Sequence, residues 1–121
     1  MKQTQDKIII NGLVVSCLIG VREHEQQEKQ NVIITIKLSV DTQKAGETDE
    51  LEDTVSYSDI AREVTEMVEN SHFQLLEKLA QAVADVCLKN RKVKKVKVLI
   101  EKPQAIAHAE SAAIKITREN E

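Results

Sequence analysis

Residues 7–19 read KIIINGLVVSCLI, a segment rich in Ile, Val and Leu that decides how the rest of the fold is arranged. Apolar residues fall on both faces of an extended chain here, which predicts a strand that needs cover on both sides. Asn11-Gly12 marks either a bulge or bend within one long strand or the tight turn of a hairpin. The hairpin would leave a very short first strand, so the sequence favours the bulge.

A second strand is predicted after a polar, glutamate-rich loop at residues 22–30. From Asn31 to Asp41, apolar and polar residues alternate, which is typical of a half-buried strand. Because the connecting loop is short, we expect this strand to run antiparallel to the first. Residues 41–53 then form a charged connector.

A first amphipathic helix is predicted over residues 58–70. Ser56 and Asp59 have the spacing of a capping box at its start. Apolar residues then recur at the intervals expected of one helix face.

A second helix is predicted directly afterwards. Ser71 and Gln74 repeat the capping-box spacing. Apolar residues again recur at helical intervals, and they do so up to Asn90.

Two further strands complete the chain. Lys and Glu alternate with Val and Ile from Lys92 to Lys102, which predicts an amphipathic strand. A last strand is marked by three alternating apolar residues, Ala112, Ile114 and Ile116. The order ββααββ predicts a single α+β domain over residues 1–121, with an antiparallel sheet covered on one face. Such a sheet has two open edges, which together with the apolar first strand favour association with other subunits.

Composition argues against several classes of partner. The net charge is −3 and the aromatic content is 2%, so the chain lacks both the basic excess and the stacking platforms used for nucleic acids. Cys17 and Cys87 lie in apolar segments, as expected of buried, reduced thiols in a cytoplasmic protein. The longest charge-free stretch, residues 8–21, is shorter than the roughly 20 residues of a membrane span.

No metal site is predicted, because the three histidines are dispersed and form no cluster with cysteine. Lys102 precedes Pro103, the only proline, at the end of a predicted strand. The proline restrains the backbone there, so Lys102 is either a placed acid-base group or one more solvated lysine.

Three other polar residues are candidates for a site. Tyr57 directly precedes the first predicted helix, where its ring serves either a site or the structure. Glu77 borders the apolar face of the second helix, where it suits a ligand with two adjacent N–H donors or simply stabilises the helix N-terminus. The local sequence of Glu25, in the polar loop, indicates a solvated glutamate.

Four motifs considered together are more specific than each one alone. They are Ile19-Gly20-Val21-x-x-x-Glu25-Gln26, Val55-Ser56-Tyr57-Ser58-Asp59-Ile60, Leu75-Leu76-Glu77-Lys78-Leu79-Ala80 and Glu101-Lys102-Pro103-Gln104-Ala105. In order and spacing, over nearly the whole chain, they resemble the dihydroneopterin aldolase family.

The resemblance implies the tunnelling fold, in which four subunits form a barrel and two barrels stack as an octamer. It also implies folate biosynthesis without a cofactor, by cleavage of 7,8-dihydroneopterin at a site between adjacent subunits. The expected catalytic residues are Lys102, Tyr57 and Glu25. The expected pterin-binding residues are Glu77, Leu76, Val55 and Ser56.

Two alternatives to the aldolase remain open. Glu23, next to Glu25, resembles the related dihydroneopterin triphosphate epimerases, which invert the 2′ centre through the same retro-aldol intermediate. His24 stands where some relatives have an aromatic residue. The alternative from another class is a non-catalytic, pterin-binding or ring-forming subunit.

Overall fold

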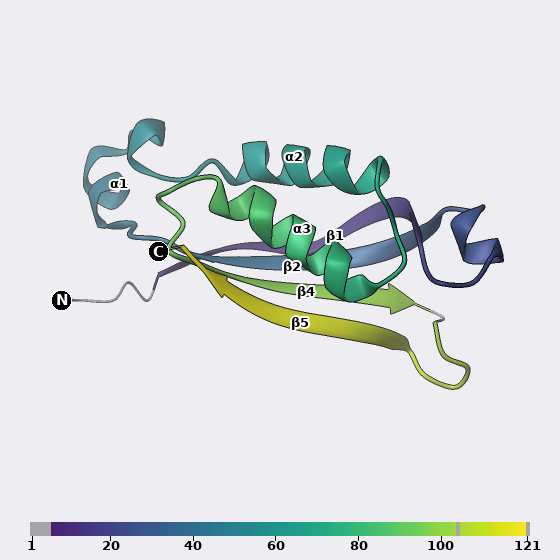
Figure 1. Cartoon of the computed structure of the whole chain (residues 1–121). Coiled ribbons are helices and arrows are strands. Elements are labelled where there is room, and N and C mark those ends of the chain that lie inside the picture. The colour runs from purple at the N-terminus through teal and green to yellow at the C-terminus, as the bar shows by residue number, and fades with distance from the viewer. Residues whose placement is uncertain (1–5, 104, 121) are drawn as a thin grey trace.

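The computed structural model describes residues 6–103 and 105–120, so Gln104 of the fourth motif lies outside the described residues. Two helices, α2 (Tyr57–Glu69) and α3 (Leu76–Leu88), lie on one face of a five-stranded sheet (Figure 1). The strands are β1 (Lys7–Ile19), β2 (Gln30–Ser39), β3 (His72–Phe73), β4 (Lys95–Pro103) and β5 (Ser111–Glu119). Their order in the sheet is β3-β1-β2-β4-β5.

The predicted α+β class is confirmed, but the element order was incomplete. β3 lies between the two helices and pairs in parallel with Leu18 and Ile19 of β1, so the sheet is mixed rather than purely antiparallel. The connector at residues 41–53 also contains a short helix, α1 (Gln43–Thr48), and a 3-10 turn, η2 (Leu51–Asp53). A second 3-10 turn, η1 (His24–Gln26), lies in the loop between β1 and β2.

The bulge predicted in the first strand is present, and no hairpin forms there. Pairing of β1 with β2 passes from Ile10 opposite Ile36 to Leu13 opposite Ile34, so two residues of β1 face one of β2. Gly12 has φ +70°, a left-handed conformation that glycine adopts at little cost. Its N–H donates to Thr35 Oγ1 at 3.1 Å, so the extra residue is tied to the neighbouring strand.

The first predicted helix cap is confirmed and the second is wrong. Ser56 is the N-cap of α2, and its Oγ accepts from the N–H of Asp59 at 3.3 Å. α3 instead begins after Leu75, without a side-chain cap. Ser71 belongs to the end of α2, because its hydroxyl donates to the Val68 carbonyl at 2.7 Å. The residues that follow are used by β3 before α3 can start.

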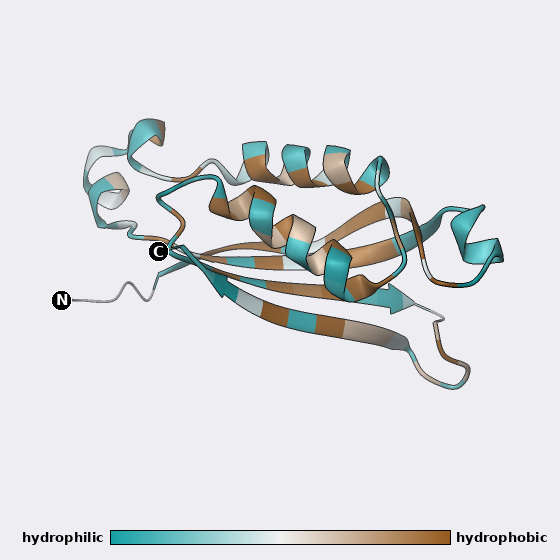
Figure 2. Cartoon of the chain, in the orientation of Figure 1, coloured by the Kyte–Doolittle hydropathy of each residue, from teal (hydrophilic) through white to brown (hydrophobic). Residues whose placement is uncertain are grey.

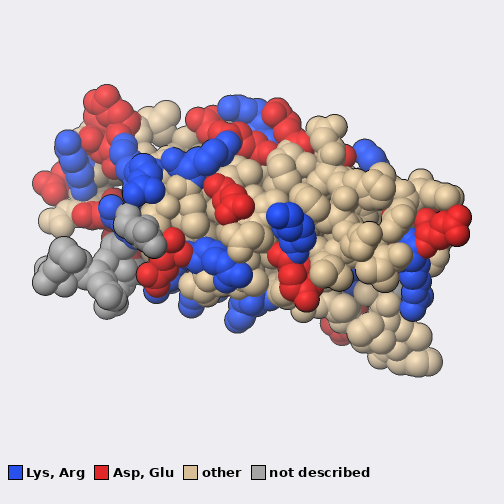
Figure 3. Space-filling view, viewed as in Figure 1, with Lys and Arg blue, Asp and Glu red and all other residues tan. Residues whose placement is uncertain are grey.

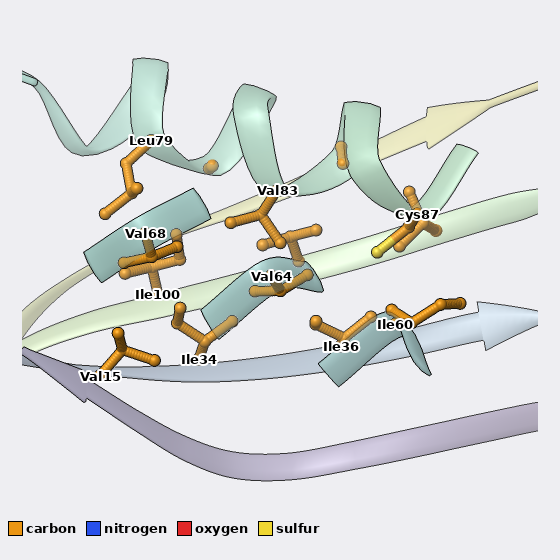
Figure 4. Packing of buried hydrophobic residues seen from close by; sticks show 14 of the residues in the cluster. Val15, Ile34, Ile36, Ile60, Val64, Val68, Leu79, Val83, Cys87 and Ile100 are labelled. Carbon is orange, nitrogen blue, oxygen red and sulfur yellow. The ribbon is translucent and has the colours of Figure 1, made fainter. Parts of the chain in front are cut away.

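The core lies between the helices and the covered face of the sheet. Val and Ile side chains of β1, β2 and β4 pack against apolar side chains of α2 and α3 (Figure 4). The ribbon of both helices carries hydrophobic and hydrophilic residues in alternation, as expected of amphipathic helices (Figure 2). Among the largest fully buried side chains are Ile34, Ile36, Ile100, Val64 and Leu79. Cover on both faces of the first strand was predicted, but in one chain only one face is covered, and Ile9 and Val14 on the other face are more than half exposed.

Most charged side chains lie on the surface and the two cysteines lie in the interior. Acidic and basic side chains are interspersed over the helices rather than gathered by sign (Figure 3). Cys17 and Cys87 are both free and buried, as predicted. Burial raises the pKa of the Cys87 thiol to about 12, so it stays protonated at neutral pH. No helix in the described part of the chain is long and apolar enough to cross a membrane.

Candidate active site

An ion pair joins two of the predicted site residues. Lys102 Nζ donates to Glu25 Oε2 at 2.5 Å, and the two side chains are only 12% and 16% exposed. Lys102 comes from the end of β4, and Glu25 comes from η1 in the loop after β1. Glu25 is therefore not the solvated loop residue that its local sequence suggests.

The position of Lys102 follows from strand alternation. Val98 and Ile100 point into the core, so Lys102 lies on the same covered face, just beyond the core. An ammonium there needs a partner, because burying an unpaired charge is costly. Glu25 supplies that partner from the neighbouring loop.

The Glu25 carboxylate is held by three donors. Besides Lys102, Gln30 Nε2 donates to Oε2 and the Arg22 N–H donates to Oε1, each at 3.4 Å. The hydrogen bond from Lys102 contributes most to lowering the pKa of Glu25, and the bonds from Gln30 and Arg22 add to it, against the opposing effect of burial. Glu25 is thus an ionised acceptor at neutral pH.

Gly20 makes room for this carboxylate. Its φ of +137° is a conformation that other residues rarely adopt, and a Cβ there would lie 2.3 Å from the Glu25 Cδ and Oε1 atoms. The Gly20 N–H also donates to the Phe73 carbonyl at 3.1 Å, which ties the end of β1 to β3. The glycine therefore connects the loop that carries Glu25 with the segment leading into α3.

An open cleft of about 440 Å³ lies beside the ion pair. Its walls include Glu25, Gln30 and Pro103, together with loop residues such as Arg22 and His24. The cleft has the size of a small-molecule site and offers a carboxylate, an amide and a nearby ammonium as polar groups. Among residues 6–103 and 105–120, no group of three or more His, Cys, Asp or Glu side chains could hold a metal ion.

Glu77 and Leu76 lie at the same end of the sheet. They form the first turn of α3, which starts just after Phe73 of β3. Glu77 is exposed, and within the described part of the chain its carboxylate has neither a hydrogen bond nor an ion pair. It is therefore available to a ligand, whereas Leu76 is half-buried against the core.

Val55, Ser56 and Tyr57 lie at the opposite end. Val55 is buried beside a second cleft, of about 460 Å³, which Val40 and Lys94 also line next to the start of β4. At about 3.3 Å per residue, the length of β4 places Lys102 roughly 20 Å away. Tyr57 is 60% exposed and is not part of the core. One chain thus brings together Glu25 and Lys102 but not Tyr57.

Two residues of the site, Gly20 and Gln30, were assigned no role from the sequence. Gly20 was part of a motif but had no role assigned, although a glycine directly after a strand is a signal for an unusual backbone. Gln30 was assigned to the polar loop. Its spacing of two from Val32 and four from Ile34 was the available signal, since it places Gln30 on the covered face.

Known proteins similar to this chain have related names. Residues 8–117 match the family model described as dihydroneopterin aldolase. The chain is 41% identical over 93% of its length to the Folic acid synthesis protein FOL1 of Dictyostelium discoideum, of which it spans 17%. It is 35% identical over 95% of its length to dihydroneopterin aldolase of Escherichia coli K12, covering 94% of that protein.

A solved structure and a second type of relative complete the comparison. The crystal structure of E. coli dihydroneopterin aldolase in complex with neopterin superposes with a TM-score of 0.90 and 34% identity, covering 94% of this chain and 99% of that one. The dihydroneopterin triphosphate 2′-epimerase of E. coli K12 is 29% identical over 97% of this chain and 98% of its own. The family model and these relatives together show that the chain belongs to the dihydroneopterin aldolase family.

Proposed function

We propose that this protein is a lyase of folate biosynthesis that cleaves 7,8-dihydroneopterin into 6-hydroxymethyl-7,8-dihydropterin and glycolaldehyde. Family membership and the relative solved with neopterin support the reaction and its substrate class. The observation that carries the proposal is the Lys102–Glu25 pair at the edge of a cleft. It provides a proton donor and an acceptor within reach of one small molecule.

The substrate supplies the electron sink for this reaction. Its dihydropterin ring contains a C=N bond conjugated to the side-chain bond that breaks. Removal of the proton from the 2′ hydroxyl forms the aldehyde C=O and breaks the C1′–C2′ bond, and the electrons move toward N5, which takes up a proton. Protonation of C1′ in the resulting enamine, with loss of the proton taken up at N5, then re-forms the C=N bond and gives the hydroxymethyl product. The chemistry needs neither a Schiff-base lysine nor a metal ion.

Each polar residue has a proposed task in this scheme. Lys102 delivers the proton near N5, through water, and Glu25 orients the side-chain hydroxyls as an ionised acceptor. Glu77 binds the pterin amino and N3–H edge with both carboxylate oxygens. Tyr57 transfers protons at the side-chain carbons. Contacts from Leu76, Val55 and Ser56 complete the pterin pocket.

The separation of Tyr57 from Lys102 supports a site shared between subunits. β3 pairs with only Leu18 and Ile19, so the rest of the outer edge of β1 lies open within residues 6–103 and 105–120, as does the outer edge of β5. Edges of this kind can pair between copies and close a ring. We therefore propose the tunnelling fold, with four subunits in a ring and two rings in an octamer. The cytoplasm, where Cys17 and Cys87 stay reduced, is the proposed location.

The 2′-epimerase activity is the second candidate, favoured by the similarity to the E. coli epimerase. Both reactions pass through the same cleaved intermediate. They differ in whether the aldehyde leaves or rotates and adds back. The same side chains can therefore support both reactions, and the products decide between them.

Incubation of purified protein with 7,8-dihydroneopterin and excess chelator tests the proposal. Release of glycolaldehyde is the expected result. Inversion at C2′ without aldehyde release would establish the epimerase instead. Unchanged substrate would refute both activities and leave the non-catalytic pterin-binding subunit.

A further inference from the structure

Gln30 connects the Glu25 carboxylate to the end of β1. It opens β2, opposite Cys17 of β1, and its side chain lies on the covered face at the wall of the cleft. Its Nε2 donates to the Ile19 carbonyl at 2.8 Å and to Glu25 Oε2 at 3.4 Å. One amide group thus joins the end of β1 to the candidate acid-base pair.

These two contacts fix which way the amide points. The Ile19 carbonyl and the Glu25 carboxylate are both acceptors, and an NH₂ group has two hydrogens to give them. The opposite orientation would bring Gln30 Oε1 against two other oxygens. Gln30 therefore acts as a fixed double donor.

Glu25 has a support that does not depend on Lys102. Glu25 Oε2 accepts from both Lys102 and Gln30, while the Arg22 N–H supports Oε1. If Lys102 turns toward a bound molecule, Gln30 and Arg22 still hold the carboxylate. If Gln30 were also absent, the 3.4 Å bond from the Arg22 N–H would be the one support left among residues 6–103 and 105–120.

We infer that Gln30 is a positioning residue that keeps the Glu25 carboxylate oriented while Lys102 transfers its proton. The inference rests on the proposed function for its effect on turnover. Its effect on Glu25 itself follows from geometry alone and is measurable without substrate. Both bonds of the Gln30 amide go to the Ile19 carbonyl and Glu25, and neither goes to Glu77 or Tyr57, the residues assigned to the pterin ring and the side-chain carbons, so KM should depend little on Gln30.

The test compares Gln30→Met with a matched control, Gln26→Met. Methionine keeps the length of the side chain and removes both donors. Gln26 lies in η1, in the loop that leads to β2, and its Nε2 donates to the Val21 carbonyl at 3.5 Å but makes no bond to Glu25. For Gln30→Met we expect kcat to fall about tenfold with KM within about twofold, because a hydrogen bond to a charged group is lost. Gln26→Met should leave both constants unchanged.

Two readouts separate positioning from a general structural defect. The acid limb of the kcat profile should move to higher pH in Gln30→Met, and the Glu25 carboxyl resonance in ¹³C NMR should titrate at higher pH without any substrate. A wild-type profile and a wild-type Glu25 titration would overturn the inference. If Gln30→Met does not fold, Gln30→Glu keeps the shape and polarity. It should shift the Glu25 titration in the same direction, because two carboxylates then share one site. An unshifted titration in that variant would equally overturn the inference.

Failure of the inference is distinguishable from failure of the proposed function. Wild-type protein that releases no glycolaldehyde would refute the function, while the NMR titration would still decide the role of Gln30. Active wild-type protein whose Gln30→Met variant titrates and turns over normally would refute only the role of Gln30.

Discussion

Lys102 and Glu25 are 77 positions apart in the sequence, and their side chains meet at 2.5 Å at the end of the core. Strand alternation places Lys102 on the covered face, while the special backbone of Gly20 lets Glu25 turn back against the end of β1. The pair is mostly shielded from water, so its interaction is stronger than that of a surface ion pair. This arrangement leads to predictions for Lys102, Glu25 and Gly20.

Replacement of Lys102 by alanine should lower turnover far more than pterin binding. Positioned acid-base groups contribute about 10² to 10⁴ in rate, and we expect kcat to fall by a factor in that range. Pterin affinity, measured by fluorescence titration, should change little because Glu77 holds the ring. Lys97→Ala, an exposed lysine of the same strand, is the control. Turnover equal to the wild type in Lys102→Ala would exclude the assigned role.

Glu77→Ala should weaken pterin binding more than it lowers turnover. The carboxylate has no partner within the described part of the chain, so its removal should cost little stability and should weaken pterin binding by about 10- to 100-fold through the lost charge-assisted bonds. The neighbouring Lys78→Ala serves as a matched exposed control on α3. Intact pterin affinity in a calorimetric titration of Glu77→Ala would contradict the role as anchor.

Stability should depend on pH through Glu25. Its pKa in the folded protein lies below the ordinary 4.5, chiefly because of the bond from Lys102, so ionisation stabilises the folded state above that pH. The contribution should disappear as the pH falls through the lowered pKa of the folded state. Urea unfolding of wild type and Glu25→Gln, at equal protein concentration, should therefore differ most near pH 7, and the difference should shrink as the pH falls through the lowered pKa of Glu25. Asp53, whose pKa is also lowered, first of all by the Thr48 hydroxyl, contributes equally to both proteins. A difference independent of pH would contradict the prediction.

Gly20→Ala tests the fit between the end of β1 and Glu25. The added Cβ meets the carboxylate at 2.3 Å in a backbone conformation that alanine avoids, so the unfolding free energy should fall by about 1 to 3 kcal/mol and turnover should fall with it. Gly46→Ala is the control, because nothing lies within 4 Å of a Cβ there, and helix α1 should gain up to about 1 kcal/mol. Equal stability of Gly20→Ala and wild type in urea would show that the loop adapts without strain.

Local patterns predicted the parts of this fold that depend on local physics. The bulge at Asn11-Gly12 and the Ser56 cap follow from backbone preferences that a few residues determine. The Ser71 capping box failed because His72 and Phe73 join β1 by contacts over 50 positions away in the sequence. The hydrogen bond between Gln30 and Glu25 could not be predicted for a related reason. Strand alternation with Val32 places Gln30 on the covered face, but nothing in its local sequence identifies Glu25, which reaches it only when the loop folds back.

Tyr57 and Lys102 provide the sharpest test of assembly, because they lie at opposite ends of the sheet within one subunit. Tyr57→Phe and Lys102→Ala should each be nearly inactive alone, since every site would lack one group. In protein made by co-expression of the two variants, a site formed by the Tyr57 end of a Lys102→Ala subunit and the Lys102 end of a Tyr57→Phe subunit is intact. Random assembly should make about one quarter of the sites intact and restore about that fraction of wild-type kcat. The double variant Tyr57→Phe/Lys102→Ala, expressed alone, is the control and should stay inactive, because each of its sites lacks both groups. Co-expressed single variants that remain as inactive as each alone, while size-exclusion chromatography shows mixed oligomers, would mean that Tyr57 and Lys102 do not serve one site between subunits.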